Sequence, residues 1–338
     1  MGNDLKSNRV EFARFGEHFD LTAVPFLHSL EKERKTRLII GILLTLILIP
    51  ISLSIALYLH PLPVDSSRFR HFRVLIYVAI FLLPMSGYLV IMSSLKQKTK
   101  LYLAKNISSF LGWNHSIEED GKDLVQNIYS FGVLPKYSYI HINDILRGSH
   151  EYWPFTLREV ILTKSQMLPY NRNRTVFKGV ILSFAVRPTL SGEAVITMNP
   201  YLGHPHKRPS IKYEGVMNSL NRKITIRASS KRIMKTILCN RFQKALFELE
   251  SKLPAMNLAC VMYNNELHIP ITAENMFEVD WLFNKMESKI RVQKMLDEFS
   301  NVLDLLDIFL KPRTCRETGM TKVPEFRYLT PNDPPYIA

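Results

Sequence analysis

Four lysines in close succession offer the clearest binding chemistry in the sequence. Lys96, Lys98, Lys100 and Lys105 lie at the end of a long uncharged run. Ammonium groups in such a place suit the phosphates of an anionic lipid leaflet, where each basic residue near the surface contributes about 1 kcal/mol of attraction. We therefore predict that these four lysines contact anionic lipid.

Other patterns with chemical meaning are weaker. His204 and His206 lie two residues apart and could share a metal ion, but no third ligand is recognisable nearby. Ser93 and Lys96 match SxxK by letters only, because a lysine at that place suits headgroups. The sequence contains no glycine-rich phosphate loop, no HExxH and no GxSxG. We predict no catalytic, cofactor or metal site.

Four acidic residues are candidates for acid–base chemistry only if the fold brings them together. They are Asp144, Glu159, Glu278 and Asp280, and they are scattered along the chain. General acid–base catalysis needs its groups within hydrogen-bond reach of one substrate. The sequence does not decide which of the four converge, so we assign no acid–base pair.

Two uncharged runs must position the lysines. Residues 38–59 and 74–95 contain no Asp, Glu, Lys or Arg. At about 1.5 Å per residue, each run is long enough to cross a hydrocarbon core of roughly 30 Å. Two charge-free runs of this length predict transmembrane helices rather than a buried hairpin in a globular core. The short loop between them predicts that the two helices form a hairpin. Thr22 is expected to cap the first helix, with Pro25 near its first turn.

Basic residues on either side of the hairpin predict its orientation. The flank before the first run carries Lys32, Arg34, Lys35 and Arg37, and the flank after the second carries the four lysines named above. The connecting loop carries Arg68, Arg70 and Arg73. Because basic flanks remain in the cytoplasm, we predict an integral membrane protein with both termini cytoplasmic. Residues 1–37 are then a cytoplasmic N-terminal segment.

Composition narrows the class of protein further. The chain of 338 residues has a formal net charge of +14. Nucleic acid is another common partner of basic chains, but no aromatic-basic recognition motif accompanies the charge, so we predict no nucleic-acid partner. Three cysteines without a CxxC pair fit a reducing compartment and give no zinc signal.

Residues 96–310 are predicted to form a cytoplasmic α+β domain. Residues 100–132 have helical spacing with a break at 113–122. Four segments then follow a period of two: 155–164, 175–186, 193–199 and 222–229. Tight links between them predict a mostly antiparallel sheet. A helix capped by Ser229 or Ser230 follows, and then a β-hairpin that turns at Asn264-Asn265.

The last predicted element is a long C-terminal helix capped by Asn275. Its later half places apolar residues three and four apart: Val292, Met295, Phe299, Val302, Leu306 and Phe309. We favour packing against the sheet; the alternative is a self-association seam that makes a homo-oligomer. Residues 311–338 are rich in proline, and we predict a disordered tail, with a docking peptide at the end as the alternative.

Four segments occur in a recognisable order: "FGVLPKYSYIHINDILRG", "LREVILTK", "VFKGVILSFAV" and "NMFEVDWLF". With the hairpin before them, they resemble a bacterial family known as domain of unknown function 3137, over roughly residues 20–310. The best-matching positions are Leu134, Pro135, Tyr137, Asp144, Gly148, Glu159, Phe177, Gly179, Phe277 and Glu278. The resemblance implies a membrane-anchored bacterial protein with its main domain in the cytoplasm, and it supplies no reaction.

We expect a non-enzymatic binding or scaffold protein whose first partner is the lipid bilayer. A membrane tether confines the domain to a thin layer and raises its effective concentration for membrane partners. Two alternatives stay open: a membrane-bound enzyme whose site residues meet only in the fold, and a subunit of a larger membrane assembly.

Overall fold

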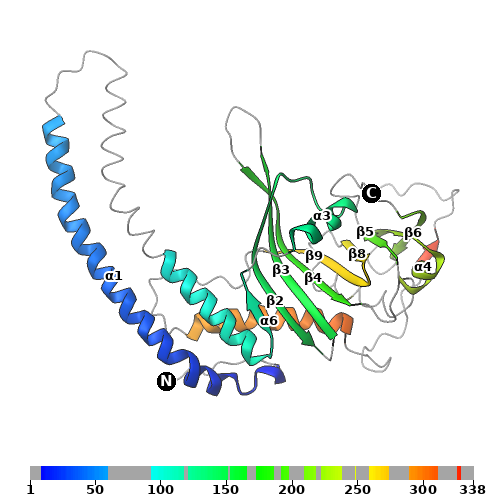
Figure 1. Cartoon of the computed structure of the whole chain (residues 1–338), viewed down its shortest axis with the longest axis horizontal. Helices are drawn as coiled ribbons and strands as arrows, with labels where there is room; N and C mark the ends of the chain where they lie inside the picture. Colours follow the sequence, from blue (N-terminus) through cyan, green and yellow to red (C-terminus); the bar gives the residue numbers. More distant parts are fainter. Residues whose placement is uncertain are drawn as a thin grey trace, which may run out of the picture. The chain divides into compact units, whose positions relative to one another are not determined.

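The chain has an α+β fold, as its sequence predicts, in the computed structural model shown in Figure 1. The structure describes residues 9–59, 93–117, 121–150, 153–165, 173–185, 192–197, 209–217, 222–237, 248, 259–273, 289–310 and 326–328. The chain divides into two compact units. Unit 1 comprises Met1–Phe110 and Phe277–Asp297; unit 2 comprises Leu111–Met276 and Glu298–Ala338. Residues 96–110, assigned on sequence to the α+β domain, thus fall in unit 1.

Unit 1 is built on a long helix, α1 (Phe15–Leu59), which follows a short 3-10 turn, η1 (Val10–Phe12). The first half of α1 buries one stripe of side chains: Phe15, Phe19, Ala23, Leu27 and Leu30. Spacings of three and four residues keep these side chains on one face of the helix. The apolar face therefore begins at Phe15, well before the first predicted membrane run.

The predicted cap of this helix is wrong. Thr22 lies inside α1, where its hydroxyl donates a hydrogen bond of 2.7 Å to the backbone oxygen of His18. Pro25 also lies inside the helix. A threonine hydroxyl can bond to the carbonyl one turn earlier and remain in a helix, and the buried stripe that continues back to Phe15 overrides the local capping signal.

A second helix of unit 1 covers residues 93–110. Its buried face again repeats every four residues, at Leu95, Thr99, Leu103 and Ile107. Most of the predicted run 74–95 lies outside the described residues, which include only its last three positions. The first nine residues of α6 (Lys289–Leu310) also belong to unit 1.

Unit 2 contains one antiparallel sheet with the strand order β1-β2-β3-β4-β9-β8-β5-β7-β6-β10. The strands are β1 (Asn114–Ser116), β2 (Tyr139–His150), β3 (Trp153–Ser165), β4 (Asn173–Ala185), β5 (Ala194–Thr197), β6 (Ile211–Met217), β7 (Arg222–Ala228), β8 (Ala259–Tyr263), β9 (Glu266–Thr272) and β10 (Phe326–Tyr328). Every described strand pair is antiparallel, which confirms the predicted sheet type.

The predicted strands correspond to β3, β4, β5 and β7, and four other strands were not predicted. Strand β1 lies in the break expected between two helical segments, and β2 and β6 carry too many polar residues to show a clear period of two. Strand β10 lies within residues 311–338, for which composition predicts disorder; it pairs with residues 215–217 of β6. All four strands therefore come from segments in which the sequence pattern of a strand is weak.

One face of the sheet packs against the helix α3 (Lys122–Ser130). Val125 and Ile128 of this helix share a buried cluster with Val160 of β3 and Ile181 of β4. Gly132, with φ of 80°, ends this segment in the left-handed conformation that favours glycine.

The other face carries a cluster of aromatic rings. The ring of Trp113 lies 4.8 Å from Phe155 of β3 and 6.1 Å from Phe299 of α6, measured between centroids. Gly148 of β2 is the cross-strand neighbour of Phe155. Because successive side chains of a strand point to opposite faces, Phe155 and Val160 serve two different cores.

Two local predictions are confirmed. Ser230 caps α4 (Lys231–Ile237): its hydroxyl oxygen accepts a hydrogen bond of 3.3 Å from the backbone N–H of Ile233. The strands β8 and β9 turn at Asn264 and Asn265, whose φ angles of 52° and 62° are those of a two-residue hairpin loop.

The apolar spacing of the C-terminal helix is accounted for by packing within one chain. Five of the six predicted positions are buried: Val292, Met295, Phe299, Val302 and Leu306. The side chain of Phe309 lies outside the described set, as do the predicted helix start at Asn275 and the residues up to 288. A self-association seam through these positions stays a prediction, and it would have to use side chains that are already covered.

Candidate functional site

The helix α1 and the helix over residues 93–110 lie side by side and antiparallel in unit 1 (Figure 1). The hydroxyl of Tyr102 donates to the backbone oxygen of Thr22 at 2.8 Å, and Nδ2 of Asn106 donates to Oγ1 of Thr22 at 2.9 Å. The rings of Phe26 and Tyr102 stack with their centroids 3.7 Å apart. Further toward the start of α1, Phe15 meets Phe110 at 5.2 Å.

At the other end of this helix pair, Glu33 joins the two helices. Its carboxylate accepts hydrogen bonds from Arg37 on its own helix and from Nζ of Lys98, at 3.3 Å. Arg37 also donates from Nη1 to Oγ of Ser94 at 2.7 Å. Since Arg37 and Ser94 are neighbours, Leu38 and Leu95 lie at the same end of the pair.

The pKa of Glu33 reflects this network. Partial burial would raise the pKa, but the hydrogen bond from Lys98 and the positive charges of Arg37 and Lys98 outweigh it, so the pKa lies below its usual value. The carboxylate is therefore the ionised centre of a group with two cations.

A second ion pair lies on the core side of α1. Arg34 donates from Nη2 to Oε1 of Glu31 at 2.7 Å and from Nε to Oε2 at 2.9 Å. Both side chains are buried, at 10% and 8% exposure. Such a bidentate pair stabilises two buried charges that lie one turn apart. The guanidinium group of Arg34 is therefore buried within unit 1 and does not face solvent.

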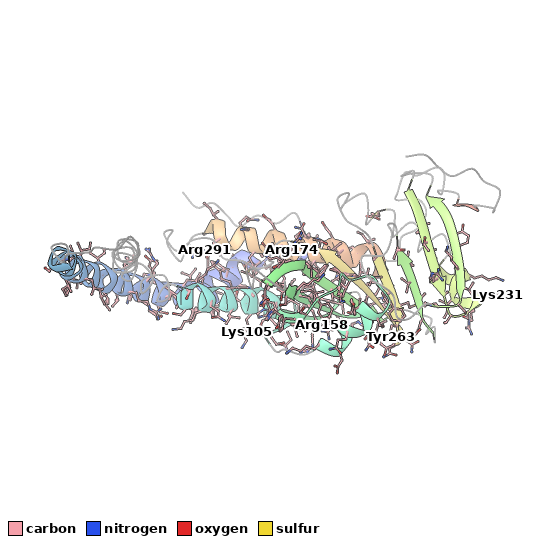
Figure 2. All side chains as sticks on the ribbon, turned by 90° about the horizontal axis from the view of Figure 1, so that it is seen from above. Lys105, Arg158, Arg174, Lys231, Tyr263 and Arg291 are labelled. Carbon is pink, nitrogen blue, oxygen red and sulfur yellow. The ribbon has the colours of Figure 1, made fainter. Side chains whose placement is uncertain are left out.

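The structure does not bring the four predicted lysines onto one exposed face. Lys96 and Lys100 are one turn apart, half-buried, and engaged in interactions of their own. Lys98 and Lys105 are exposed on the opposite side of the helix, and Lys98 pairs with Glu33. Lys105, labelled in Figure 2, lies ten residues beyond Leu95, about 15 Å along the helix axis.

In the sequence, the basic residues of α1 predict only the orientation of the hairpin. Two of them, Lys32 and Lys35, are exposed in the structure, whereas Arg34 and Arg37 are taken up by ion pairs. The helical period could have identified Arg34 as a buried residue, because Arg34 continues the buried stripe of Leu27 and Leu30.

Beyond Lys35, α1 exposes a run of aliphatic side chains. Nine large ones between residues 39 and 51 are each 45–62% exposed: Ile39, Ile40, Ile42, Leu43, Leu44, Leu46, Ile47, Ile49 and Ile51. They cover more than half of the helix circumference, whereas Gly41 is buried and Leu48 is half-buried on the remaining side. Among the helices that the structure describes, none meets the combined requirements of length and apolar character for crossing a membrane.

In unit 2, the sheet brings together two of the four scattered acids. Asp144 lies in the irregular part of β2 between Ile142 and Ile145, opposite Glu159 of β3. Both carboxylates are 2% exposed, and Oδ1 of Asp144 is hydrogen-bonded to Nε2 of His115 at 2.9 Å. Glu278 and Asp280 lie outside the described residues. At this degree of burial the pair is closed to a dissolved substrate.

A second buried polar pair lies on the α3 face of the sheet. Nδ1 of His268 is 2.9 Å from Oγ of Ser183, its cross-strand neighbour. Burial lowers the pKa of His268 to about 4, and the charge of Arg158 acts in the same direction. The serine is 3% exposed and the histidine 1%, so this Ser–His pair is held where a substrate does not reach it.

The described residues among the remaining sequence candidates form no metal cluster. Among the described residues, no group of three or more His, Cys, Asp or Glu side chains is arranged to hold a metal ion. His204 and His206 lie outside those residues. Ser93 and Lys96 lie on the helix over 93–110. Cys260 is a free, buried thiol of β8, and the other two cysteines lie outside the described part.

Part of the chain matches a known protein family. Residues 175–311 match the profile of a family described as "Protein of unknown function (DUF3137)". No curated protein matches the chain. One solved structure, the mycobacterial trehalose monomycolate transport factor A, TtfA, is similar with a TM-score of 0.32 and 8% identity. That similarity covers 64% of this chain and 97% of TtfA.

The family match is narrower than the resemblance seen in the sequence, which extends over roughly residues 20–310. It begins in β4 and ends after α6. Of the ten best-matching positions named above, Phe177, Gly179, Phe277 and Glu278 fall within it. Residues 175–311 form a domain of the DUF3137 family.

Proposed function

We propose that the chain is a non-enzymatic binding or scaffold protein of a bacterial inner membrane. In this proposal the apolar part of α1 and the run 74–95 anchor it, and the sheet of unit 2 works on the cytoplasmic side together with both termini. The partner that the sheet recognises is a membrane component or a protein held at the membrane, because a tether favours such partners by effective concentration.

The exposed aliphatic run of α1 carries this proposal. Nine Ile and Leu side chains between residues 39 and 51 are each about half exposed. Full burial of one such side chain is worth roughly 1.5–3 kcal/mol, so covering the exposed half of nine is worth on the order of 10 kcal/mol. A contiguous apolar surface of this kind marks an interaction site, and lipid can cover a surface that extends over more than half of the helix circumference.

The antiparallel helix pair supports the hairpin topology. Leu38 and Leu95 lie at the same end of the pair, because Arg37 is bonded to Ser94 and Glu33 to Lys98. The first run therefore begins, and the second run ends, at the same end of the helix pair. A short loop between two such runs returns the chain to the side from which it left.

A binding role is supported over catalysis by the state of the polar groups. The pairs Asp144–Glu159 and Ser183–His268 are each 3% exposed or less. A catalytic group has to reach a reacting atom within hydrogen-bond distance. Among the described residues, an enzyme that used one of these pairs would require an opening of the sheet's core.

Extraction from membranes tests the anchor. The full chain should remain in the pellet after alkaline carbonate treatment. A variant with Ile42→Arg and Leu46→Arg should move to the soluble fraction, because each arginine costs about 2.5–3.5 kcal/mol at the centre of a membrane helix. Ser109→Arg with Gln126→Arg, at exposed positions elsewhere, is the matched control and should stay in the pellet.

Orientation needs a separate experiment. A reporter fused after Ala338 should be active only in the form that works in the cytosol, and protease added outside spheroplasts should leave the C-terminal part intact. Release of the unmodified chain by carbonate would overturn the membrane anchor. Digestion of its C-terminal part from outside would overturn the orientation alone.

A further inference from the structure

We infer that Lys32 and Lys35 of α1, and not the lysines of the helix over 93–110, form the contact site for anionic lipid headgroups. The inference rests on the proposed membrane anchor and names the lipid that the anchor selects. It moves the predicted site from one helix of the pair to the other.

The positive charges of Lys32 and Lys35 are available to bind a phosphate. Lys32 and Lys35 are exposed, and no carboxylate among the described residues pairs with either ammonium group. Arg37 and Lys98, in contrast, share the carboxylate of Glu33. A cation already paired with a carboxylate gains less from a phosphate than one that is free, because the pair must first be broken.

Lys32 and Lys35 lie just before the exposed aliphatic run of α1. Lys32, Lys35, Ile39, Ile42 and Leu46 follow one another at spacings of three and four residues, so they form one exposed stripe. Lys35 is one turn before Ile39, about 6 Å along the axis. If Ile39 marks the start of the hydrocarbon, both ammonium groups reach the level of the phosphates, since a lysine stem lies along apolar surface while its charge stays in water.

Lys32 and Lys35 lie on a side of α1 that does not face the partner helix. Glu33 and Arg37, which point to the helix over 93–110, alternate with Lys32 and Lys35. The lysine stripe is therefore on a different side of α1 from the partner helix, and a lipid next to Ile39 and Ile42 lies directly below it. Lys105 is also exposed, but it is about 15 Å from the membrane end of its helix.

Lipid selectivity of the full chain tests the site. The chain is reconstituted in phosphatidylcholine vesicles that contain either spin-labelled phosphatidylglycerol or spin-labelled phosphatidylcholine. The measured quantity is the association constant of the first lipid relative to the second. The unmodified chain should prefer phosphatidylglycerol, and high salt should weaken the preference.

Lys32→Gln with Lys35→Gln should lower that preference by about fivefold for each lysine, the ratio that corresponds to the attraction of one basic residue near an anionic surface. Lys32→Arg with Lys35→Arg should restore it, which separates charge from any effect on helix structure. Lys105→Gln with Lys136→Gln, at two other exposed lysines, should leave the preference unchanged.

The results distinguish a failure of the lysine site from a failure of the membrane anchor on which it rests. A chain that stays in carbonate-washed vesicles but keeps its full preference after Lys32→Gln with Lys35→Gln overturns the lysine site alone. Equal loss in the Lys105→Gln with Lys136→Gln control overturns it too, because the effect would then be one of net charge. A chain that does not remain with vesicles overturns both.

Discussion

The indole ring of Trp113 lies directly against the backbone of Gly148. A Cβ atom at position 148 would be 2.4 Å from Cδ1 of the ring and 2.6 Å from Cγ, closer than real Cβ contacts. Trp113 is buried, and its Nε1 donates a hydrogen bond of 3.2 Å to the backbone oxygen of Ser149. The ring therefore has little freedom to move away from a new methyl group.

Replacing Gly148 by alanine should destabilise the protein by about 1–3 kcal/mol, the usual cost of overpacking a core. The midpoint of urea unfolding, followed by tryptophan fluorescence, measures the effect. Gly16→Ala is the control: its added Cβ meets nothing within 4 Å inside α1, so it should be neutral or stabilise by up to about 1 kcal/mol. Equal stability of Gly148→Ala and the unmodified chain would contradict the tight contact.

Stability should depend on pH through His268. Its pKa is about 4 in the folded protein and near 6.5 when unfolded, because burial opposes the charged form. Between these two values the unfolded chain binds a proton that the folded chain does not. Stability should therefore fall as the pH drops from about 6.5 to about 4, by on the order of 3 kcal/mol.

Unfolding free energies measured across this pH range in His268→Gln should lack that part of the slope. His141→Gln removes an exposed histidine of β2 and should keep it. A slope unchanged by His268→Gln would show that the imidazole is protonated in the folded state.

The thiol of Cys260 should be inert in the folded protein. Burial raises its pKa to about 12, so almost no thiolate is present at neutral pH. With Cys239→Ser and Cys315→Ser in place, Cys260 is the only cysteine of the chain. A thiol reagent such as a disulfide dye at pH 8 should then label the native protein only at the rate of unfolding, and the urea-unfolded protein within seconds. Fast labelling of the native form would mean that β8 opens readily.

The hairpin of β8 and β9 should gain stability from Asn265→Gly. Both turn residues have positive φ, and Asn-Gly is the pair best suited to this turn. We expect a gain of about 0.5 kcal/mol in the free energy of unfolding. Asn264→Val should instead lose about 1–2 kcal/mol, because a β-branched residue is strained at positive φ. The same sign for the two substitutions would argue against the turn.

Sequence patterns predicted those helices, strands and turns that are determined by residues close together in the chain. The period of two gave β3 and β4, the pair Asn264-Asn265 gave a hairpin, and Ser230 gave a helix cap. Each depends on residues a few positions apart. Thr22 shows the limit of such signals, because a longer apolar stripe carried the helix past it.

The candidate site was harder to predict because its partners are far apart in sequence. Lys98 is paired with Glu33, 65 residues away, so its exposure could not be judged from its neighbours. Asp144 and Glu159 lie at opposite positions of neighbouring strands only because β2 is irregular between Ile142 and Ile145, and a slip of one residue would send a side chain to the other face. Strand pairings such as β4 with β9 likewise join distant segments.

The helix α1 has no joint between its paired half and its aliphatic half. It is continuous from Phe15 to Leu59, and its two internal prolines are at positions 25 and 50. The stretch from Phe26 to Ile49 thus behaves as a stiff rod, since sharp bends in helices need proline or a comparable defect. A force on the aliphatic half is therefore transmitted along α1 to the hydrogen bonds that Arg37 and Glu33 make with the neighbouring helix.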